Sequence, residues 1–244
     1  MKNLIFGIVT ITTLLFSCSP DNPNPNGNGG QTYTQGTPVT DIDGNTYPTI
    51  ISDCGQTWTA KNLNVSRYRN GELIPQVTDP SQWSNLTTGA WCYSNNVTAN
   101  STIYGKLYNW YAVNDPRGLA PSGYHVPSDG EWNKLVKCID QFADTTITQN
   151  QSTIAGGAMK EAGLTHWLSP NTGATNSSGF TGLPGGTRNA GGSFGTFGGN
   201  GFWWTSTDIS YNYALFRYLD RFYDNMFRND NIKTIGFSVR CIKN

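Results

Sequence analysis

Charge is scarce in this chain of 244 residues. Lys and Arg together number 16, Asp and Glu together number 16, and charged residues make up 13% of the sequence. A net charge of zero removes the electrostatic basis for binding nucleic acid, which requires a basic surface. The chain contains two histidines and no Cys-x-x-Cys pair. We therefore predict no zinc site, because zinc needs several such ligands at short spacing.

Aromatic residues and glycine are abundant instead. Trp, Tyr and Phe make up 13% of the chain, and Gly numbers 28. This many rings supply enough apolar surface for a folded core, which excludes a disordered chain. Low charge combined with many Gly, Asn, Ser and Thr residues favours a loop-rich domain outside the cytoplasm over a helical cytosolic enzyme.

The first residues have the pattern of a bacterial export signal. Lys2 gives a positive start, and the predominantly apolar run from Leu4 to Phe16, thirteen residues long, is too short to span a bilayer. The sequence Leu15-Phe16-Ser17-Cys18 resembles the lipobox of bacterial lipoproteins, which implies cleavage before Cys18 and lipid attachment to it. We therefore predict a signal peptide at 1–17. The alternative is an ordinary secretory signal that is cut elsewhere, with Cys18 incidental.

Residues 18–37 are predicted to be a flexible tether. The stretch after Cys18 is rich in Pro, Asn and Gly and has no apolar side chain to bury. About twenty such residues extend roughly 25 Å as a coil, which would hold a domain clear of a membrane. Residues 38–244 show no second linker and no internal repeat, so we predict that they form one domain.

The spacing of apolar residues predicts both helices and strands in this domain. Ser128 and Glu131 form a capping box, and apolar residues at helical spacing follow it as far as Ile139. Further helices are expected at 104–113 and 153–162. A turn at 41–47 leads into a strand that continues through 49–51. Other short strands, of which the last three close an antiparallel sheet, are expected at 56–60, 90–94, 202–206, 214–219 and 237–242.

Five blocks of aromatic residues and glycine carry a family resemblance. They read Gly105-Lys-Leu-Tyr-Asn-Trp-Tyr-Ala-Val113, Gly123-Tyr-His-Val-Pro-Ser-Asp-Gly-Glu-Trp132, Ser178-Gly-Phe-Thr-Gly-Leu-Pro-Gly-Gly186, Gly201-Phe-Trp-Trp-Thr-Ser206 and Gly236-Phe-Ser-Val-Arg-Cys241. In this order and spacing they resemble the Fibrobacter succinogenes major paralogous domain. That bacterial cell-envelope family is similar to C-type-lectin-like and formylglycine-generating-enzyme-like folds. The resemblance implies an α+β domain of C-type-lectin-like fold, with two main helices, short twisted antiparallel strands and long loops.

The four cysteines that follow the lipid-attachment cysteine are Cys54, Cys92, Cys138 and Cys241. Export to an oxidising compartment favours two disulfides, and the residues alone leave three connectivities open. The lectin-like resemblance implies the pair Cys138–Cys241, which would join a helix to the last strand, and then the pair Cys54–Cys92. Ala120 stands where the family often has a further cysteine, so the chain departs from the family pattern there.

The segment 203–228 is predicted to carry a binding site. Flat aromatic rings stack on sugar or peptide faces, and Arg offers planar, bidentate hydrogen bonds. The same region displays ligands in similar lectin-like folds. The alternative is that alternate aromatic residues fill the core, where at least one of Trp203 and Trp204 must lie because neighbours cannot share a strand face. The predicted ligand-binding residues are Tyr211, Tyr213, Arg217, Tyr218, Arg221 and Tyr223.

No catalytic residue, metal or cofactor is predicted. His125 is expected to be a hydrogen-bonded core histidine. Oxidases of the formylglycine-generating kind need two neighbouring cysteines near the chain end for copper, and Cys241 has no such neighbour. Asp41 and Asp43 are expected to form an Asx-turn rather than a calcium loop. Calcium at Asn229–Asn231 is an alternative without a supporting motif.

The sequence therefore predicts a lipoprotein of the cell envelope, anchored by lipid at the outer membrane, with exposure at the cell surface left open. Its expected activity is non-enzymatic. A lectin-like module would serve adhesion or capture a glycan or protein ligand, with no role for nucleic acid. A structural subunit of a surface assembly is the alternative, and an oxidase of the formylglycine-generating kind ranks last.

Overall fold

The computed structural model describes residues 33–244. The predicted signal peptide, the lipid-attachment residue Cys18 and most of the predicted tether lie outside the described residues. The first strand begins at Tyr33, so regular structure starts before the expected domain boundary at residue 38. Within the described range, no helix is both long enough and apolar enough to cross a membrane.

The described residues form a mostly β structure, so the predicted α+β fold with two main helices is wrong. Strands, many of them short, build four small antiparallel sheets. The strands are β1 (Tyr33–Thr40), β2 (Thr46–Ser52), β3 (Thr57–Thr59), β4 (Trp91–Tyr93), β5 (Lys106–Tyr108), β6 (Tyr124–His125), β7 (Gln149–Ser152), β8 (Thr187–Arg188), β9 (Phe194–Gly195), β10 (Asn200–Asp208), β11 (Tyr213–Asp220), β12 (Met226–Ile232) and β13 (Ile242–Lys243). The helices are α1 (Pro80–Ser84), α2 (Ser101–Tyr104), α3 (Trp110–Val113), α4 (Asp129–Ile139) and α5 (Ala155–Met159), with 3-10 helices η1 (Ser94–Asn96) and η2 (Thr98–Asn100).

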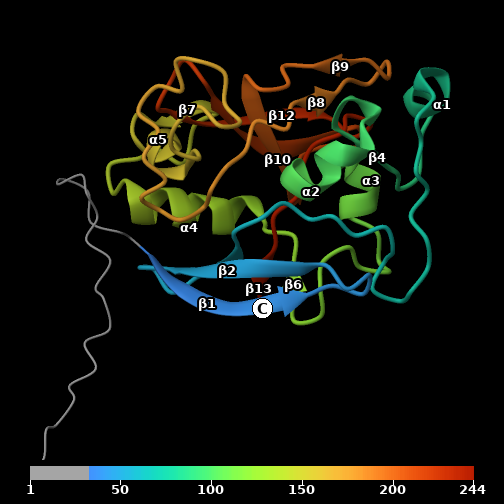
Figure 1. The fold of residues 1–244 in the computed structure, drawn as a ribbon, viewed down its shortest axis with the longest axis horizontal. Helices are drawn as coiled ribbons and strands as arrows, with labels where there is room; N and C mark the ends of the chain where they lie inside the picture. The colour runs from blue at the N-terminus through green and yellow to red at the C-terminus, as the bar shows by residue number, and fades with distance from the viewer. Residues whose placement is uncertain (1–32) are drawn as a thin grey trace, which may run out of the picture.

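A five-stranded sheet in the order β1-β2-β3-β13-β6 forms one side of the molecule (Figure 1). The last strand, β13, lies between β3 and β6, so the end of the chain joins a strand from its first quarter to one from its middle. Trp58 of β3 is fully buried and packs against Trp132 of α4, with ring centroids 4.9 Å apart. This contact fixes the sheet against the helix.

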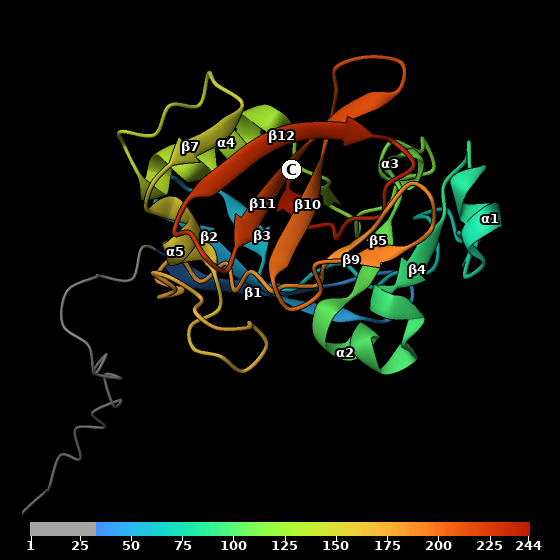
Figure 2. The same cartoon turned by 90° about the horizontal axis from the view of Figure 1, so that it is seen from above.

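A second sheet, in the order β10-β11-β12-β7, lies on the other side of α4 (Figures 1 and 2). Its register places Phe202 opposite Tyr218, and Tyr218 opposite Phe227. Trp203 and Trp204 point to opposite faces of β10, and both are fully buried, so the prediction that at least one belongs to the core is confirmed. Trp203 shares a core with α4, and Trp204 lies in the core on the other face.

The predicted helix after the capping box is confirmed as α4. The Ser128 hydroxyl accepts a hydrogen bond from the Glu131 amide, and the Glu131 carboxylate accepts one from the Ser128 amide at 2.7 Å. Trp132, Leu135 and Val136 are buried between the two sheets. Burial of each such side chain contributes roughly 1.5–3 kcal/mol, so this face holds the helix in place.

The predicted helix at 104–113 is wrong. This segment holds the end of α2, the strand β5 and the helix α3. Gly105 separates α2 from β5 with φ 70°, and a Cβ at this position would lie 2.6 Å from the carbonyl oxygen of Leu63. Asn109 then begins α3, because its side chain accepts a hydrogen bond from the Ala112 amide. A close approach of the backbone therefore overrides the helical spacing of the apolar residues.

The remaining elements agree with the prediction in part. The expected helix at 153–162 is present but shortened to α5. Strands occur near 49–51, 56–60, 90–94, 202–206 and 214–219, with shifted ends. At the end of the chain the expected strand is reduced to β13, and Phe237 and Ser238 make isolated bridges instead.

One disulfide joins Cys54 to Cys138, with the Cα atoms 5.9 Å apart, so the implied pairs Cys138–Cys241 and Cys54–Cys92 are wrong. Cys138 lies near the end of α4 and faces the turn that follows β2, whereas Cys92 and Cys241 point into apolar cores and carry no disulfide. Burial raises the pKa of the Cys92 thiol to about 12 and also raises the pKa of Cys241. Both thiols are therefore protonated and unreactive at neutral pH.

Candidate binding surface

The six predicted binding residues do not form one site. Tyr211 and Tyr213 lie at the β10–β11 hairpin, whereas Arg221 and Tyr223 lie in the turn between β11 and β12. The eight residues of β11 span roughly 25 Å, because a strand rises about 3.3 Å per residue. One small ligand therefore cannot contact both ends of the strand.

Arg217, in the middle of β11, is fully buried and points away from any surface. Its guanidinium donates hydrogen bonds to Asp129 at 2.9 Å and to Asn133 at 2.7 Å, both on α4. Burial lowers the pKa of Arg217 to about 10, although the Asp129 carboxylate opposes that shift. Arg228 of β12 donates to the same carboxylate. Arg217 thus joins the sheet to α4 and cannot contact a ligand at the surface.

A row of half-buried aromatic rings crosses the opposite face of the same sheet. Tyr218 stacks on Phe227, with centroids 4.5 Å apart and planes 10° apart, and on Phe202 at 5.7 Å. Tyr223 meets the Phe227 ring edge-on at 6.0 Å. Phe202 and Phe227 were not among the predicted residues. The alternation of residues along β10 and β12 could have identified them, because each lies opposite Tyr218 in the register.

The turn from 220 to 224 presents two exposed rings beside this row. Phe222 is 53% exposed and Tyr223 is 55% exposed. Asp220 fixes the start of the turn, since one of its carboxylate oxygens accepts the Phe222 amide at 2.7 Å. The guanidinium of Arg221 lies 4.4 Å from the centroid of the Phe222 ring. We define the β11–β12 aromatic surface as Phe202, Tyr218, Arg221, Phe222, Tyr223 and Phe227.

A buried lysine fixes the backbone of this turn by hydrogen bonds. The Lys160 ammonium donates hydrogen bonds to the carbonyl oxygens of Thr172 at 2.7 Å, Asp220 at 3.0 Å and Tyr223 at 2.7 Å. The side chain is completely shielded from solvent. Burial lowers the pKa of Lys160 to about 8, although the charges of Asp224 and Asp220 raise it. All three N–H groups of the ammonium are therefore used to fix backbone around the aromatic surface.

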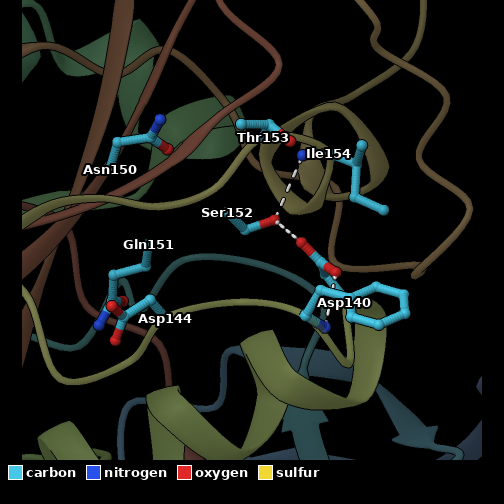
Figure 3. Close-up of a pocket in the computed structure, with 8 residues that line it drawn as sticks. Asp140, Asp144, Asn150, Gln151, Ser152, Thr153 and Ile154 are labelled. Carbon is cyan, nitrogen blue, oxygen red and sulfur yellow. Dashed lines mark hydrogen bonds between the residues drawn. The ribbon is translucent and has the colours of Figure 1, made fainter.

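A hollow of about 370 Å³ lies between the end of α4 and β7 (Figure 3). Asp140 points toward Ser152, whose hydroxyl donates to its carboxylate at 2.7 Å. The same hydroxyl accepts the Ala155 amide at 2.9 Å, so Asp140 positions the start of α5. Asp144 is engaged by Thr146. Across residues 33–244, no group of three or more His, Cys, Asp or Glu residues could hold a metal ion.

The other sequence candidates have structural partners. Asp41 accepts hydrogen bonds from the amides of Asp43 and Asn45 at 2.9 Å, so the predicted Asx-turn is confirmed. Asn229–Asn231 lies within β12 rather than in a long loop. His125 is hydrogen-bonded as expected, to Asn244 and Glu131, but its side chain is 40% exposed and does not belong to the core.

The run Gly191-Gly-Ser-Phe-Gly195 has the Gly-x-Ser-x-Gly spacing of a hydrolase nucleophile. That chemistry requires the serine on a sharp turn between a strand and a helix. Ser193 instead lies in the β8–β9 hairpin, where its hydroxyl accepts a hydrogen bond from Asn189 at 3.1 Å. The spacing therefore carries no catalytic interpretation.

The fold and surface define a mostly β domain that contains a disulfide and displays an aromatic surface. The chain belongs to the Fibrobacter succinogenes major domain family, whose family model matches residues 52–243. All five blocks that carried the resemblance lie in this range, so the family prediction is confirmed. No curated protein and no solved structure matches the chain. The comparisons thus give a family and leave the activity to be argued from the structure.

Proposed function

We propose that the domain is a non-enzymatic module that binds a glycan or protein ligand through the β11–β12 aromatic surface. The observation that carries this proposal is the exposure of Phe222 and Tyr223 on a turn that Lys160 fixes. Exposed aromatic side chains offer a large, rigid contact area and dominate binding hot spots. A turn that is already ordered loses little entropy when it binds.

The arrangement of the rings indicates where a ligand would stack. Phe202, Tyr218 and Phe227 stack on one another, so much of their ring faces is already covered. Tyr223 meets Phe227 edge-on and is half exposed, which leaves one of its faces open to a sugar ring or an apolar side chain. Arg221 adds a planar donor beside these rings for a hydroxyl, carboxylate or carbonyl oxygen.

We further propose that Cys18 anchors the chain by lipid in the outer membrane of the cell envelope. The support is the Leu15-Phe16-Ser17-Cys18 lipobox followed by a tether rich in Pro, Asn and Gly. Several acyl chains at about 0.8 kcal/mol per methylene give stable anchoring. Mass spectrometry of the protein from its native membranes tests this. An acylated Cys18 at the N-terminus is expected, and an unmodified Cys18 within a longer chain contradicts the anchor.

The binding proposal is tested by probing a glycan and peptide array with the purified chain, with calcium and again with a chelator. Specific signals are expected from the unaltered chain and should disappear in the double variant Phe222→Ala, Tyr223→Ala. The matched control is Tyr211→Ala, Tyr213→Ala at the other end of β11, which should retain the signals. Both variants should melt within about 2 °C of the unaltered chain, because these are surface changes.

The outcomes separate the alternatives. Loss of signal in the control alone places the site at the β10–β11 hairpin and contradicts the β11–β12 surface. If the double variant unfolds, the single variant Tyr223→Ala replaces it in the test. This change removes the ring with an open face and should weaken the same array signals. A blank array in both conditions contradicts a recognition module and favours a structural subunit of a surface assembly.

A further inference from the structure

A second hollow of about 390 Å³ lies where the start of β1, β2, α2 and the loops within 160–183 meet. Its volume falls near the lower end of the range for small-molecule sites. Ile103 and Leu183 supply apolar lining, whereas Lys61, Glu161, His166 and Thr181 supply polar groups. We call this hollow the His166 groove. No residue of the β11–β12 aromatic surface lines it.

His166 lines the groove, and one of its ring nitrogens has no partner among residues 33–244. Its Nδ1 lies 2.8 and 2.9 Å from the two carboxylate oxygens of Glu161, so Nδ1 carries the proton and donates. Its Nε2 makes no hydrogen bond to any residue from 33 to 244. The backbone of Glu161 is itself held, because its amide donates to Gly182 and its carbonyl accepts from Asn171. The ring is therefore oriented by fixed groups.

Lys61 is the unpaired charge of the groove. Its side chain is exposed, and it makes no ion pair or hydrogen bond with the described residues. The Glu161 carboxylate is hydrogen-bonded to His166 through both of its oxygens and forms no ion pair with Lys61 among residues 33–244. The Lys61 ammonium is therefore available to pair with a negatively charged group of a ligand. Gln35, whose side-chain amide is likewise unpaired within residues 33–244, adds a neutral hydrogen-bonding group.

Backbone strain is also located at this groove. Thr181 has φ 52°, a left-handed conformation that is costly for a β-branched residue. Asn176 holds it by accepting its amide at 2.8 Å and donating to its hydroxyl at 3.0 Å. Arg240 donates to the Thr181 carbonyl at 2.9 Å. Strain that is maintained by a dedicated network is found preferentially at ligand sites.

We propose that the His166 groove binds a sugar acid, meaning a hydroxylated ring that bears a carboxylate. The carboxylate matches the unpaired Lys61, and the hydroxyl groups match the free nitrogen of His166 and the amide of Gln35. The apolar C–H face of the ring matches Ile103 and Leu183. A simple carboxylate lacks the hydroxyl groups, and a neutral sugar lacks the charge, so either would bind more weakly.

The test measures binding of glucuronate to the full chain by ligand-observed NMR and calorimetry, with glucose and acetate as comparison ligands. Saturable binding of glucuronate is expected, at least fivefold tighter than that of glucose or acetate. Lys61→Met should weaken it about fivefold, the size expected for a partly exposed charge pair, and Lys61→Arg should restore it. Lys134→Met, which removes an exposed lysine from α4, is the matched control and should change nothing.

Four outcomes would overturn the proposal. These are the absence of saturable glucuronate binding, equal binding of glucose, equal binding of acetate, or a Lys61→Met variant that binds like the unaltered chain. The double variant Phe222→Ala, Tyr223→Ala should still bind glucuronate, since neither residue lines the groove. Loss of array binding with retained glucuronate binding therefore assigns the two sites separately.

Discussion

Replacing Lys160 with methionine should change both the pH dependence of stability and the order of the 220–224 turn. Burial lowers the pKa of Lys160 from 10.5 to about 8. Between these two values the unfolded chain binds a proton that the folded chain has released, so stability rises with pH in this window. For one such lysine the linkage relation gives a gain of about 1 kcal/mol between about pH 7 and about pH 9, allowing for some solvent screening.

This gain in stability with pH is best measured as the difference between the unaltered chain and the Lys160→Met variant. The thiols of Cys92 and Cys241 have raised pKa values, so they lower stability as pH rises through the range where unfolded thiols ionise. Their effect is the same in both proteins and cancels in the comparison. Chemical denaturation should therefore show the unaltered chain gaining about 1 kcal/mol over Lys160→Met between about pH 7 and about pH 9.

The local effect is tested by amide hydrogen exchange at neutral pH. Without the ammonium, the carbonyl oxygens of Thr172, Asp220 and Tyr223 lose their shared donor, so exchange should accelerate around 172 and 220–224. The matched control is Lys106→Met. Lys106 is also buried with its pKa lowered to about 8 by burial, but its ammonium contacts Asn64 and the Trp91 ring. Unchanged exchange at 220–224 in the Lys160 variant, or equal acceleration in both variants, would refute the reasoning.

Two further predictions concern the scaffold. Asp129→Ala should destabilise the fold by about 3 kcal/mol, because it leaves the buried guanidinium of Arg217 and that of Arg228 without an anion. Arg217→Met should lower the free energy of unfolding by less, because Asp129 keeps its ion pair with Arg228. Urea denaturation of both variants measures the two losses, and a larger loss in Arg217→Met would contradict this prediction. Changing Cys54 and Cys138 to serine should cost about 4 to 5 kcal/mol on the entropic model, since the bridge closes a separation of 84 residues. Peptide mapping without reduction should show that bridge, and a Cys138–Cys241 peptide would rule it out.

Local signals in the sequence were sufficient for some elements. The capping box located α4 because its partners are three residues apart, and alternation located β10 and β11. The prediction of a helix at 104–113 was wrong because Gly105 approaches the backbone at Leu63, which is a contact between distant parts of the chain. The predicted disulfide pairing was wrong for a related reason. The position of Cys138 relative to Cys54 depends on how α4 packs against the first sheet.

The composition of the β11–β12 aromatic surface, whose binding role is our proposal, could be anticipated only in part, for the same physical reason. Tyr218 and Tyr223 were found from composition, whereas Arg217 was misplaced because adjacent residues of β11 face opposite sides. Assigning the faces required the registers with β10 and β12, which bring Phe202 and Phe227 to Tyr218. Register is set by long-range pairing, so one strand read alone gives an alternation without saying which face is buried.

The few charges of this chain help to explain how a loop-rich domain stays ordered. Buried carbonyl groups in loops need donors, which regular sheets and helices would otherwise supply. Arg188 donates to the carbonyls of Val77, Thr78 and Gly192, and Arg240 donates to those of Thr59 and Thr181. Lys160 acts in the same way beneath the aromatic turn.

None of these three cations forms a salt bridge with a described carboxylate. Their desolvation is therefore offset by carbonyl dipoles and, for Arg188 and Arg240, by the faces of Trp83 and Phe180 at 4.3 Å. Each of them joins segments that are remote in sequence, which a local turn motif cannot do. Loops fixed in this way present rigid surfaces without extensive secondary structure, and the aromatic turn and the strained Thr181 both lie on such loops.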